Sequence, residues 1–240
     1  MHNKEQPASI PRPETSSRLV GFSEHDVRAR PFKLLRSTLG RKLSDTQCNI
    51  IGVTSAAPNA GKTFISSNLA AAMSAISVER TVLVDLDLKR CEIAELFEIT
   101  ERPGISEYLL EEVDTLGEIM RHVDETGLTV VPSFLSSANT AQLMAGERIE
   151  SLIRELRSYA NRSLVICDLP PLLVSDDAML AARHLDGVLM VVEQGVTTKK
   201  QIEAVLEMID RDKLVGTIFN RYAGSFGDPY GYGADYGNYY

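Results

Sequence analysis

The chain of 240 residues contains no tryptophan and only three cysteines. Cys48, Cys91 and Cys167 lie far apart and form no C-x-x-C motif, which argues against a secreted disulfide framework and a zinc site. The apolar runs, for example residues 188–192, are far shorter than the roughly 18 residues that a membrane-spanning helix needs. Residues 1–20 also lack the apolar stretch of a signal peptide. We therefore expect a cytoplasmic protein that reaches a membrane only through a partner.

Negative charge predominates, with a formal net charge of -8, which argues against nucleic acid as a partner. Basic residues nevertheless outnumber acidic ones nine to five over residues 1–45. The basic stretch over residues 28–42 has two interpretations. It meets an acidic surface or anionic lipid, or it is the solvated face of a helix.

Short apolar, β-branched runs alternate with longer helical patterns along the middle of the chain. This alternation is typical of βαβ units, so the sequence predicts an α/β fold with a mostly parallel central sheet and helices on both faces. The expected strands lie at residues 50–54, 81–85, 128–131, 164–168, 188–192 and 215–219. The expected helices lie at residues 31–43, 62–76, 93–97, 105–111, 116–123, 147–159, 177–183 and 199–209.

Composition divides the chain into three parts. Residues 1–22 are polar and predict a disordered leader, and residues 23–221 carry the strand and helix pattern of one domain. From Tyr222 the sequence is rich in glycine and tyrosine and has no aliphatic residue larger than alanine. Residues 222–240 therefore predict a flexible tail that builds no core.

The segment Ala56-Ala-Pro-Asn-Ala-Gly-Lys-Thr63 follows an expected strand and opens an expected helix. It matches the phosphate-binding P-loop pattern, except that Ala56 stands where glycine is usual. In such a loop backbone N–H groups cradle phosphates, Lys62 offers a cation to the β- and γ-phosphates, and Thr63 offers its hydroxyl to Mg²⁺. The sequence thus predicts the ATP site of a P-loop NTPase fold. The residues expected to contact the nucleotide there are Pro58, Asn59, Ala60, Gly61, Lys62, Thr63 and Phe64.

Acidic residues end two further apolar strands, Asp85 and Asp87 after one and Asp168 after the other. Ligands gather at the carboxyl ends of parallel strands, so these carboxylates meet the P-loop there unless they merely cap the turns that follow. Three carboxylates beside a triphosphate require a cation. We predict Mg²⁺ held by Thr63, Asp87 and Asp168, mostly through water.

Six of the eight tyrosines fall in the last 19 residues. Tyrosines in a flexible, glycine-rich tail can each enter an active site, whereas a buried tyrosine cannot present its hydroxyl in line with a γ-phosphate. A phenol is neutral at pH 7, so a carboxylate must orient it or accept its proton, and Asp85 is the candidate catalytic residue beside Lys62. The alternative is a tail with a purely associative role. The candidate phosphorylation sites are Tyr222, Tyr230, Tyr232, Tyr236, Tyr239 and Tyr240.

Over about residues 30–221 the chain resembles the bacterial tyrosine kinases of capsule and exopolysaccharide synthesis. The shared motifs are A-x-x-P-x-x-G-K-T from Ala56, the strand ending D-x-D with basic residues after it, and D-x-P-P from Asp168. The resemblance implies a P-loop tyrosine autokinase that uses ATP and Mg²⁺ and regulates polysaccharide polymerisation or export. It also implies that Asn220 hydrogen-bonds the adenine base. The glycine-rich tail begins just after Asn220, and folding it back over its own nucleotide would order many glycines, so we expect tails to be phosphorylated between subunits.

The resemblance further implies three partners: a membrane-embedded activator of the polysaccharide chain-length type, a neighbouring copy of the chain, and a phosphatase. Binding to the activator would recruit the protein to the inner face of the cell membrane. Many relatives carry E-x-x-R-x-x-R on the first helix, attributed to ring assembly, where this chain has Arg30, Lys33 and Arg36. A ring built on that ion pair is therefore not expected.

Two other functions compete with the kinase. The first is a septum-positioning or partition-type ATPase, because these proteins are similar in fold to the kinases. Such ATPases have a second lysine near the start of the P-loop, where this chain has Ala57. A noncatalytic, nucleotide-dependent adaptor is the third interpretation, because an intact nucleotide site does not require turnover.

Overall fold

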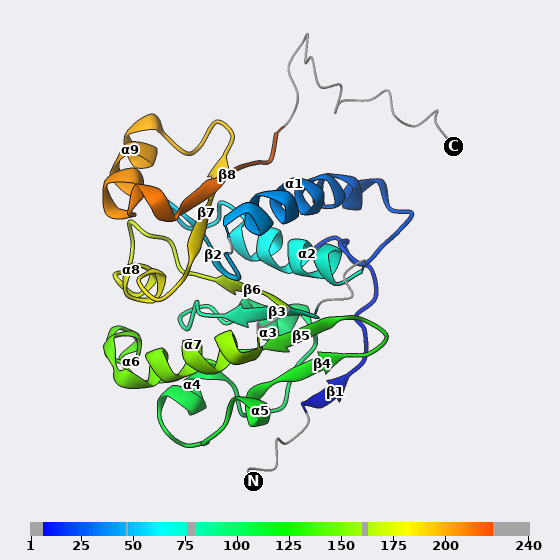
Figure 1. The fold of residues 1–240 in the computed structure, drawn as a ribbon, viewed down its shortest axis with the longest axis vertical. Coiled ribbons are helices and arrows are strands. Elements are labelled where there is room, and N and C mark those ends of the chain that lie inside the picture. Colours follow the sequence, from blue (N-terminus) through cyan, green and yellow to red (C-terminus); the bar gives the residue numbers. More distant parts are fainter. Residues whose placement is uncertain (1–6, 47, 76–79, 160–162, 223–240) are drawn as a thin grey trace.

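A computed structural model of the protein describes residues 7–46, 48–75, 80–159 and 163–222 (Figure 1). Its centre is an eight-stranded sheet in the order β1-β4-β5-β3-β6-β2-β7-β8. The strands from β5 to β8 in this order are parallel, and β4 pairs antiparallel with β5. The expected α/β fold with a mostly parallel sheet is confirmed. The strands are β1 (Ala8–Ile10), β2 (Ile50–Ser55), β3 (Arg80–Asp85), β4 (Arg121–Val123), β5 (Leu128–Val131), β6 (Ser163–Asp168), β7 (Gly187–Glu193) and β8 (Leu214–Asn220).

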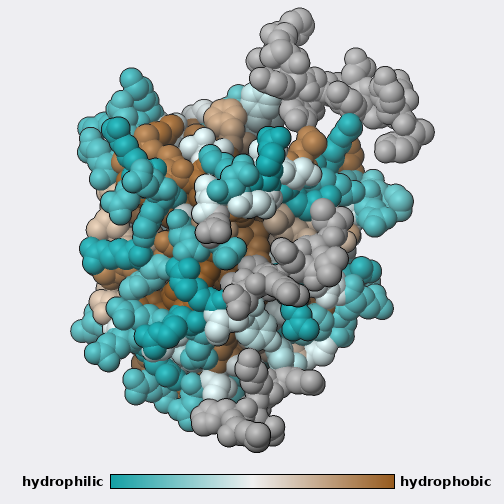
Figure 2. Space-filling view, in the orientation of Figure 1, coloured by the Kyte–Doolittle hydropathy of each residue, from teal (hydrophilic) through white to brown (hydrophobic). Residues whose placement is uncertain are grey.

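Helices cover both faces of the sheet (Figure 1). They are α1 (Arg30–Thr46), α2 (Lys62–Ser74), α3 (Glu92–Leu96), α4 (Ile105–Leu109), α5 (Leu116–Ile119), α6 (Thr140–Ala145), α7 (Glu147–Tyr159), α8 (Asp177–Ala182) and α9 (Lys199–Met208), with 3₁₀ turns at Val27–Ala29 and Arg211–Lys213. One hydrophobic cluster joins α1, α2 and α3 to the sheet, and another joins α4 to α9 to its other face. Both faces of the central strands are buried, which explains their continuous apolar sequences. Hydrophilic side chains cover most of the face in Figure 2, with hydrophobic ones visible between them.

Most predicted elements are present to within three residues at either end, but residues 116–123 do not form the single helix that was predicted. Helix α5 ends at Ile119, and Arg121–Val123 form strand β4 beside β5. The buried Arg121 guanidinium donates to the carbonyl oxygens of Glu118 at 2.9 Å and Pro103 at 3.0 Å. These contacts, one of them distant in sequence, fix the extended chain in place of the last helical turn.

Residues 7–22 also differ from the predicted disordered leader, whereas residues 1–6 lie outside the described residues. Strand β1 pairs with β4, and Leu19 and Val20 are each only 1% exposed. The side chain of Asn68 on α2 accepts the N–H groups of Val20 at 2.6 Å and Gly21 at 2.8 Å. A Cβ at Gly21 would lie 2.3 Å from the Asn68 carbonyl oxygen, so glycine is needed for this close approach. Residues 8–10 are therefore part of the sheet, and residues 20–21 are attached to α2, the helix that follows the P-loop.

Candidate functional site

The P-loop connects the end of β2 to the beginning of α2, as predicted. Asn59 and Gly61 adopt positive φ angles of 66° and 90°, and these bring the loop back over the helix N-terminus. Ala56 is not among the described residues with positive φ, so alanine meets no backbone strain there. The departure from the usual first glycine therefore leaves the loop's conformation intact.

Lysine and threonine of the P-loop each contact a carboxylate from a neighbouring strand. The Lys62 ammonium donates to Oδ2 of Asp87 at 2.6 Å, and the Thr63 hydroxyl donates to Oδ2 of Asp168 at 2.7 Å. All four residues are at most 6% exposed. The register of the parallel strands β2, β6 and β3 produces this meeting, because their carboxyl ends lie side by side.

The electrostatics of this cluster are unbalanced, because Lys62 faces three carboxylates. Burial by itself would lower the pKa of Lys62, but the charges of Asp168 and Asp87 outweigh it and raise this pKa above the ordinary value. Burial raises the pKa of Asp168 to about 6, although Lys62 and the Thr63 hydrogen bond act in the opposite direction. The cluster thus has more negative charge than its own lysine can offset.

Asp168 also retains an unused ligand atom. Its Oδ1 is buried and has no hydrogen-bond partner among the described residues. The nearby Ser66 hydroxyl donates instead to the Thr63 carbonyl oxygen at 3.1 Å. A buried, unpaired carboxylate oxygen beside a threonine hydroxyl suits a cation or its water ligands.

Asp85, the predicted proton acceptor, lies beside this cluster but has no exposed surface. Its Oδ1 accepts the Asp87 N–H at 3.1 Å, and its Oδ2 accepts the Ile93 N–H at 3.3 Å. Burial, with the charges of Asp168 and Asp87 adding to it, raises the pKa of Asp85 well above its ordinary value. In this conformation a tyrosyl hydroxyl has no access to the carboxylate.

The end of β8 lies against the P-loop. The Asn220 side-chain amide donates to the Ala60 carbonyl oxygen at 2.8 Å, and a Cβ at Gly61 would lie 2.2 Å from the Asn220 nitrogen. Asn220 is therefore at the P-loop, and its amide contacts the loop itself. Tyr222 is 41% exposed, and its ring centroid lies 5.9 Å from that of Phe219. The other five candidate phosphorylation sites, Tyr230, Tyr232, Tyr236, Tyr239 and Tyr240, lie outside the described residues.

A cavity of about 290 Å³ opens at the N-terminus of α2. Gly61, Lys62, Thr63 and Phe64 line it together with Asn59, Leu96, Glu92, Arg18, Arg90 and Arg221. Sequence reasoning missed Arg18, because it falls within the predicted leader. The apolar pair Leu19-Val20 followed by glycine is the signal that was available for an ordered segment there.

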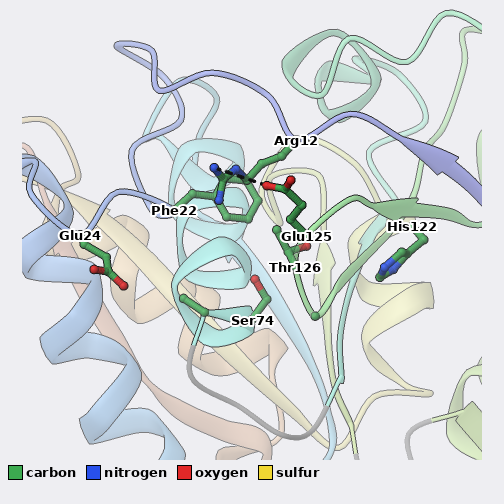
Figure 3. Close-up of a pocket in the computed structure, with 9 residues that line it drawn as sticks. Arg12, Phe22, Glu24, Ser74, His122, Glu125 and Thr126 are labelled. Carbon is green, nitrogen blue, oxygen red and sulfur yellow. Dashed lines mark ion pairs between the residues drawn. The ribbon is translucent and has the colours of Figure 1, made fainter.

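A second cavity, of about 460 Å³, lies at the opposite end of the sheet (Figure 3). Arg12, Phe22, Ser74, His122 and Glu125 line it together with Glu24 and the turn that precedes β5, and Arg12 pairs with Glu125 at 4.0 Å. This is the amino end of the parallel strands, where ligands of such sheets do not usually gather. The smaller cavity over the P-loop is therefore the candidate functional site.

The basic first helix uses two of its cations within the domain. Lys33 donates to the Glu24 carbonyl oxygen at 2.7 Å, and Arg36 donates to the Ala72 carbonyl oxygen at 2.8 Å. Both cations therefore help to fasten α1 to its neighbours. Within the described part of the chain, no helix is long and apolar enough to cross a membrane.

Comparison with known proteins agrees with the observed fold. Residues 51–229 match a family described as CobQ/CobB/MinD/ParA nucleotide binding domain. Tyrosine-protein kinase etk of Escherichia coli strain K12 is 31% identical over 199 residues, which cover 81% of this chain and 27% of that protein. Tyrosine-protein kinase wzc of Salmonella typhimurium is 30% identical over 232 residues, 93% of this chain and 31% of that protein. The chain thus spans about a quarter to a third of the length of these curated relatives.

Solved structures show the same likeness. The kinase domain of Escherichia coli tyrosine kinase ETK superposes with a TM-score of 0.75 at 26% identity, covering 91% of this chain and 92% of that chain. The septum site-determining protein MinD from Pyrococcus horikoshii, at 18% identity and a TM-score of 0.61, shares the fold alone. The resemblance to the bacterial tyrosine kinases and the P-loop NTPase fold are therefore both confirmed.

Proposed function

Because the chain belongs to the CobQ/CobB/MinD/ParA nucleotide-binding domain family, we propose that it is an ATP-dependent protein-tyrosine kinase domain that phosphorylates the tyrosines of its own tail. The observation that carries the proposal is the buried meeting of Lys62 with Asp87 and of Thr63 with Asp168 on a P-loop. The tyrosine specificity is supported by the similarity to kinase domains and by the six tyrosines after residue 221.

ATP binds with its phosphates on the N-terminus of α2. The backbone N–H groups around Gly61 and the positive end of the helix face the cavity, and Lys62 contributes the cation. The Lys62 ammonium exchanges its contact with Asp87 for the phosphates, since the phosphates carry more charge. Pro58, Asn59, Ala60 and Phe64 complete the loop, and Asn220 lies within reach of the base.

Magnesium fits the residues that are present. Thr63 and Asp168 supply a hydroxyl and an unpaired carboxylate oxygen, and Asp87 supplies a second carboxylate once Lys62 turns to the phosphates. When bound, Mg²⁺ offsets the negative charge of the triphosphate and of the transferring phosphoryl group. The protein's own contribution is to hold these oxygens in place and to keep Lys62 oriented toward the β- and γ-phosphates.

Asp85 accepts or orients the tyrosyl proton in this proposal, on one structural condition. Its carboxylate is covered by the backbone N–H groups of Asp87 and Ile93, so the segment between them must shift when substrate enters. Burial raises the pKa of Asp85, which makes its ionised carboxylate a stronger proton acceptor. Asp85→Asn should therefore retain ATP binding while losing phosphotransfer.

The tail leaves the domain just after Asn220, which contacts the P-loop, and this position favours transfer between molecules. A tail of 19 residues can extend about 60 Å, so reach alone permits a chain to modify itself. Folding the tail back over its own nucleotide would order many glycines, at about 1 to 2 kcal/mol each. Each phosphate added to the tail brings about -1.5 to -2 charges, which the carboxylates of the site repel. Modified tails therefore leave, and subunits separate.

The whole protein acts, in this proposal, on polysaccharide polymerisation or export at the inner face of the cell membrane. A membrane-embedded activator of the chain-length type recruits it, and a phosphatase resets the tail. The name of one relative, a putative tyrosine-protein kinase in a Klebsiella pneumoniae cps region, supports the role in polysaccharide synthesis.

A mixing experiment tests the transfer between molecules. One chain carries Lys62→Met with Asp87→Asn and keeps its tail, and the other is active but has its six tail tyrosines replaced by phenylalanine. Incubation with Mg²⁺ and labelled ATP should label the tail of the inactive chain. Its absence, under conditions in which wild type labels itself, would refute transfer between molecules.

A further inference from the structure

The segment after β3 forms a tight turn that begins at Asp87. The N–H groups of Arg90 and Cys91 both donate to the Asp87 carbonyl oxygen at 3.0 Å. The position of the Asp87 main chain, and with it the carboxylate that contacts Lys62, is therefore tied to the position of residues 88–91.

Two basic side chains connect this turn to two other segments. Arg90 donates to Oδ1 of Asn59 in the P-loop at 2.9 Å. Lys89 donates to the Ser175 hydroxyl at 2.8 Å, and its ammonium lies 2.8 Å from Oδ2 of Asp177. The turn is thus fastened both to the P-loop and to the beginning of α8.

Asp177 is an unusual carboxylate for a structural role alone, because it is buried without full hydrogen bonding. Its side chain is 3% exposed, and its Oδ1 has no hydrogen-bond partner among the described residues. Burial would raise its pKa, but hydrogen bonds from Lys89 and Thr140 outweigh burial, and the pKa lies below its ordinary value. The surroundings therefore favour the charged carboxylate, which is the form that pairs with Lys89.

The segment that carries Asp177 is in turn attached to the P-loop. The N–H groups of Leu172 and Leu173 donate to the carbonyl oxygens of Ser55 at 2.9 Å and Ala56 at 3.2 Å. The contacts therefore form a closed ring through three loops: the P-loop, the turn after β3, and the segment before α8. The Lys89–Asp177 ion pair is the side-chain link between the last two.

We propose that Lys89 and Asp177 are positioning residues whose ion pair fixes the turn after β3 and thereby holds the Asp87 carboxylate at the P-loop, where it contacts Lys62 in the absence of nucleotide and is available to Mg²⁺ when ATP is bound. This inference rests on the proposed function, because its consequence is measured as the rate of phosphotransfer. Neither residue lines the cavity over the P-loop, so loss of the pair acts through Asp87 and leaves the phosphate cradle in place.

The test compares Lys89→Met, Asp177→Asn, their combination and Lys89→Arg with wild type in the full chain. Lys199→Met is the matched control, because Lys199 is 89% exposed and pairs with Glu203 at 3.5 Å on α9. The measurements are the rates of phosphotyrosine formation and of Mg²⁺-dependent ATP hydrolysis, the Kd for ATP and the thermal midpoint.

We expect Lys89→Met and Asp177→Asn to slow turnover about tenfold or more with a Kd for ATP within about twofold of wild type. The double variant should be no slower than the slower single variant, because both changes break one interaction. Lys89→Arg should recover most of the rate. Lys89→Met is informative even where Asp177→Asn folds poorly, since Lys89 is 53% exposed.

Three results would overturn the positioning role: a rate for Lys89→Met equal to that of Lys199→Met, a rate loss that only follows the loss of folded protein, or a loss confined to ATP affinity. A wild type that hydrolyses ATP without making phosphotyrosine contradicts the proposed kinase activity instead. In that case the hydrolysis rates of the same variants decide the positioning role.

Discussion

Replacing Lys62 by methionine removes the cation that the structure places among three carboxylates. The side chains of Lys62 and Asp87 are 6% and 4% exposed, so water does not replace the lost contact. Removing one partner of a buried ion pair costs about 3 to 5 kcal/mol of unfolding free energy. For a domain of this size each kcal/mol corresponds to about 2 to 4 °C, so we expect Tm to fall by roughly 10 °C in the absence of nucleotide.

The assay is thermal unfolding without ATP or Mg²⁺, together with a second variant that combines Lys62→Met with Asp87→Asn. The double variant should regain most of the lost stability, because no unpaired charge remains at Asp87. Lys199→Met is again the control, and its exposed ion pair should contribute less than about 1 kcal/mol. A Lys62→Met chain as stable as wild type, or a double variant no more stable than the single one, would refute the reasoning. Neither variant should transfer phosphate.

Three further changes test separate parts of the structure. Asp168→Asn should abolish the increase in ATP affinity that Mg²⁺ produces in wild type, measured by titration with and without the metal, and an unchanged increase would exclude Asp168 from the metal site. Gly61→Ala should weaken ATP binding at least tenfold, because φ is 90° there and the new Cβ would lie 2.2 Å from the Asn220 nitrogen; unaltered binding would contradict the loop geometry. Asp186→Asn should lower the unfolding free energy by about 1 kcal/mol at pH 7, since its partly exposed carboxylate accepts from Arg157 at 2.6 Å. Burial alone would raise the pKa of Asp186, but its hydrogen bonds lower it, so this stability is present at neutral pH and is lost as pH falls below about 4, through the folded pKa. A difference from wild type that persists at lower pH would be inconsistent with this cause.

The part of the site that the sequence predicted is the part encoded locally. The P-loop, the acidic residues after β3 and β6, and the strands themselves each occupy one continuous segment with its own pattern of apolar, glycine and charged residues. Once a parallel sheet is inferred, the meeting of Lys62 with Asp87 and of Thr63 with Asp168 follows from the common direction of the strands.

What the sequence did not predict depends on contacts between distant segments. Strands β1 and β4 have three residues each, too few for an alternating pattern, and they form through pairing at the sheet's edge. Helix α6 has six residues and begins at an Asn139 cap, which a short polar stretch does not distinguish from a loop. The Lys89–Asp177 pair joins residues that are 88 positions apart, and neither residue's own neighbourhood indicates the other.

The structure shows that the Asp85 carboxylate is covered, which the sequence did not indicate. The D-x-D spacing placed both carboxylates at the strand end, and both are there. The spacing did not show that the Asp87 and Ile93 N–H groups would cover Asp85. Comparing Asp85→Asn with wild type in ATP binding and in phosphotransfer therefore separates a proton acceptor from a residue that only shapes the turn, because the latter would alter both.

The central claim is that this domain transfers phosphate from ATP to tyrosine. The most direct measurement incubates the full chain with Mg²⁺ and ATP labelled at the γ-phosphate, and then locates the label by peptide mass spectrometry. We expect phosphotyrosine within residues 222–240 in wild type and none in the variant that combines Lys62→Met with Asp87→Asn. Release of labelled inorganic phosphate with no phosphotyrosine at any site would contradict the claim and would favour an ATPase of the positioning or partition type.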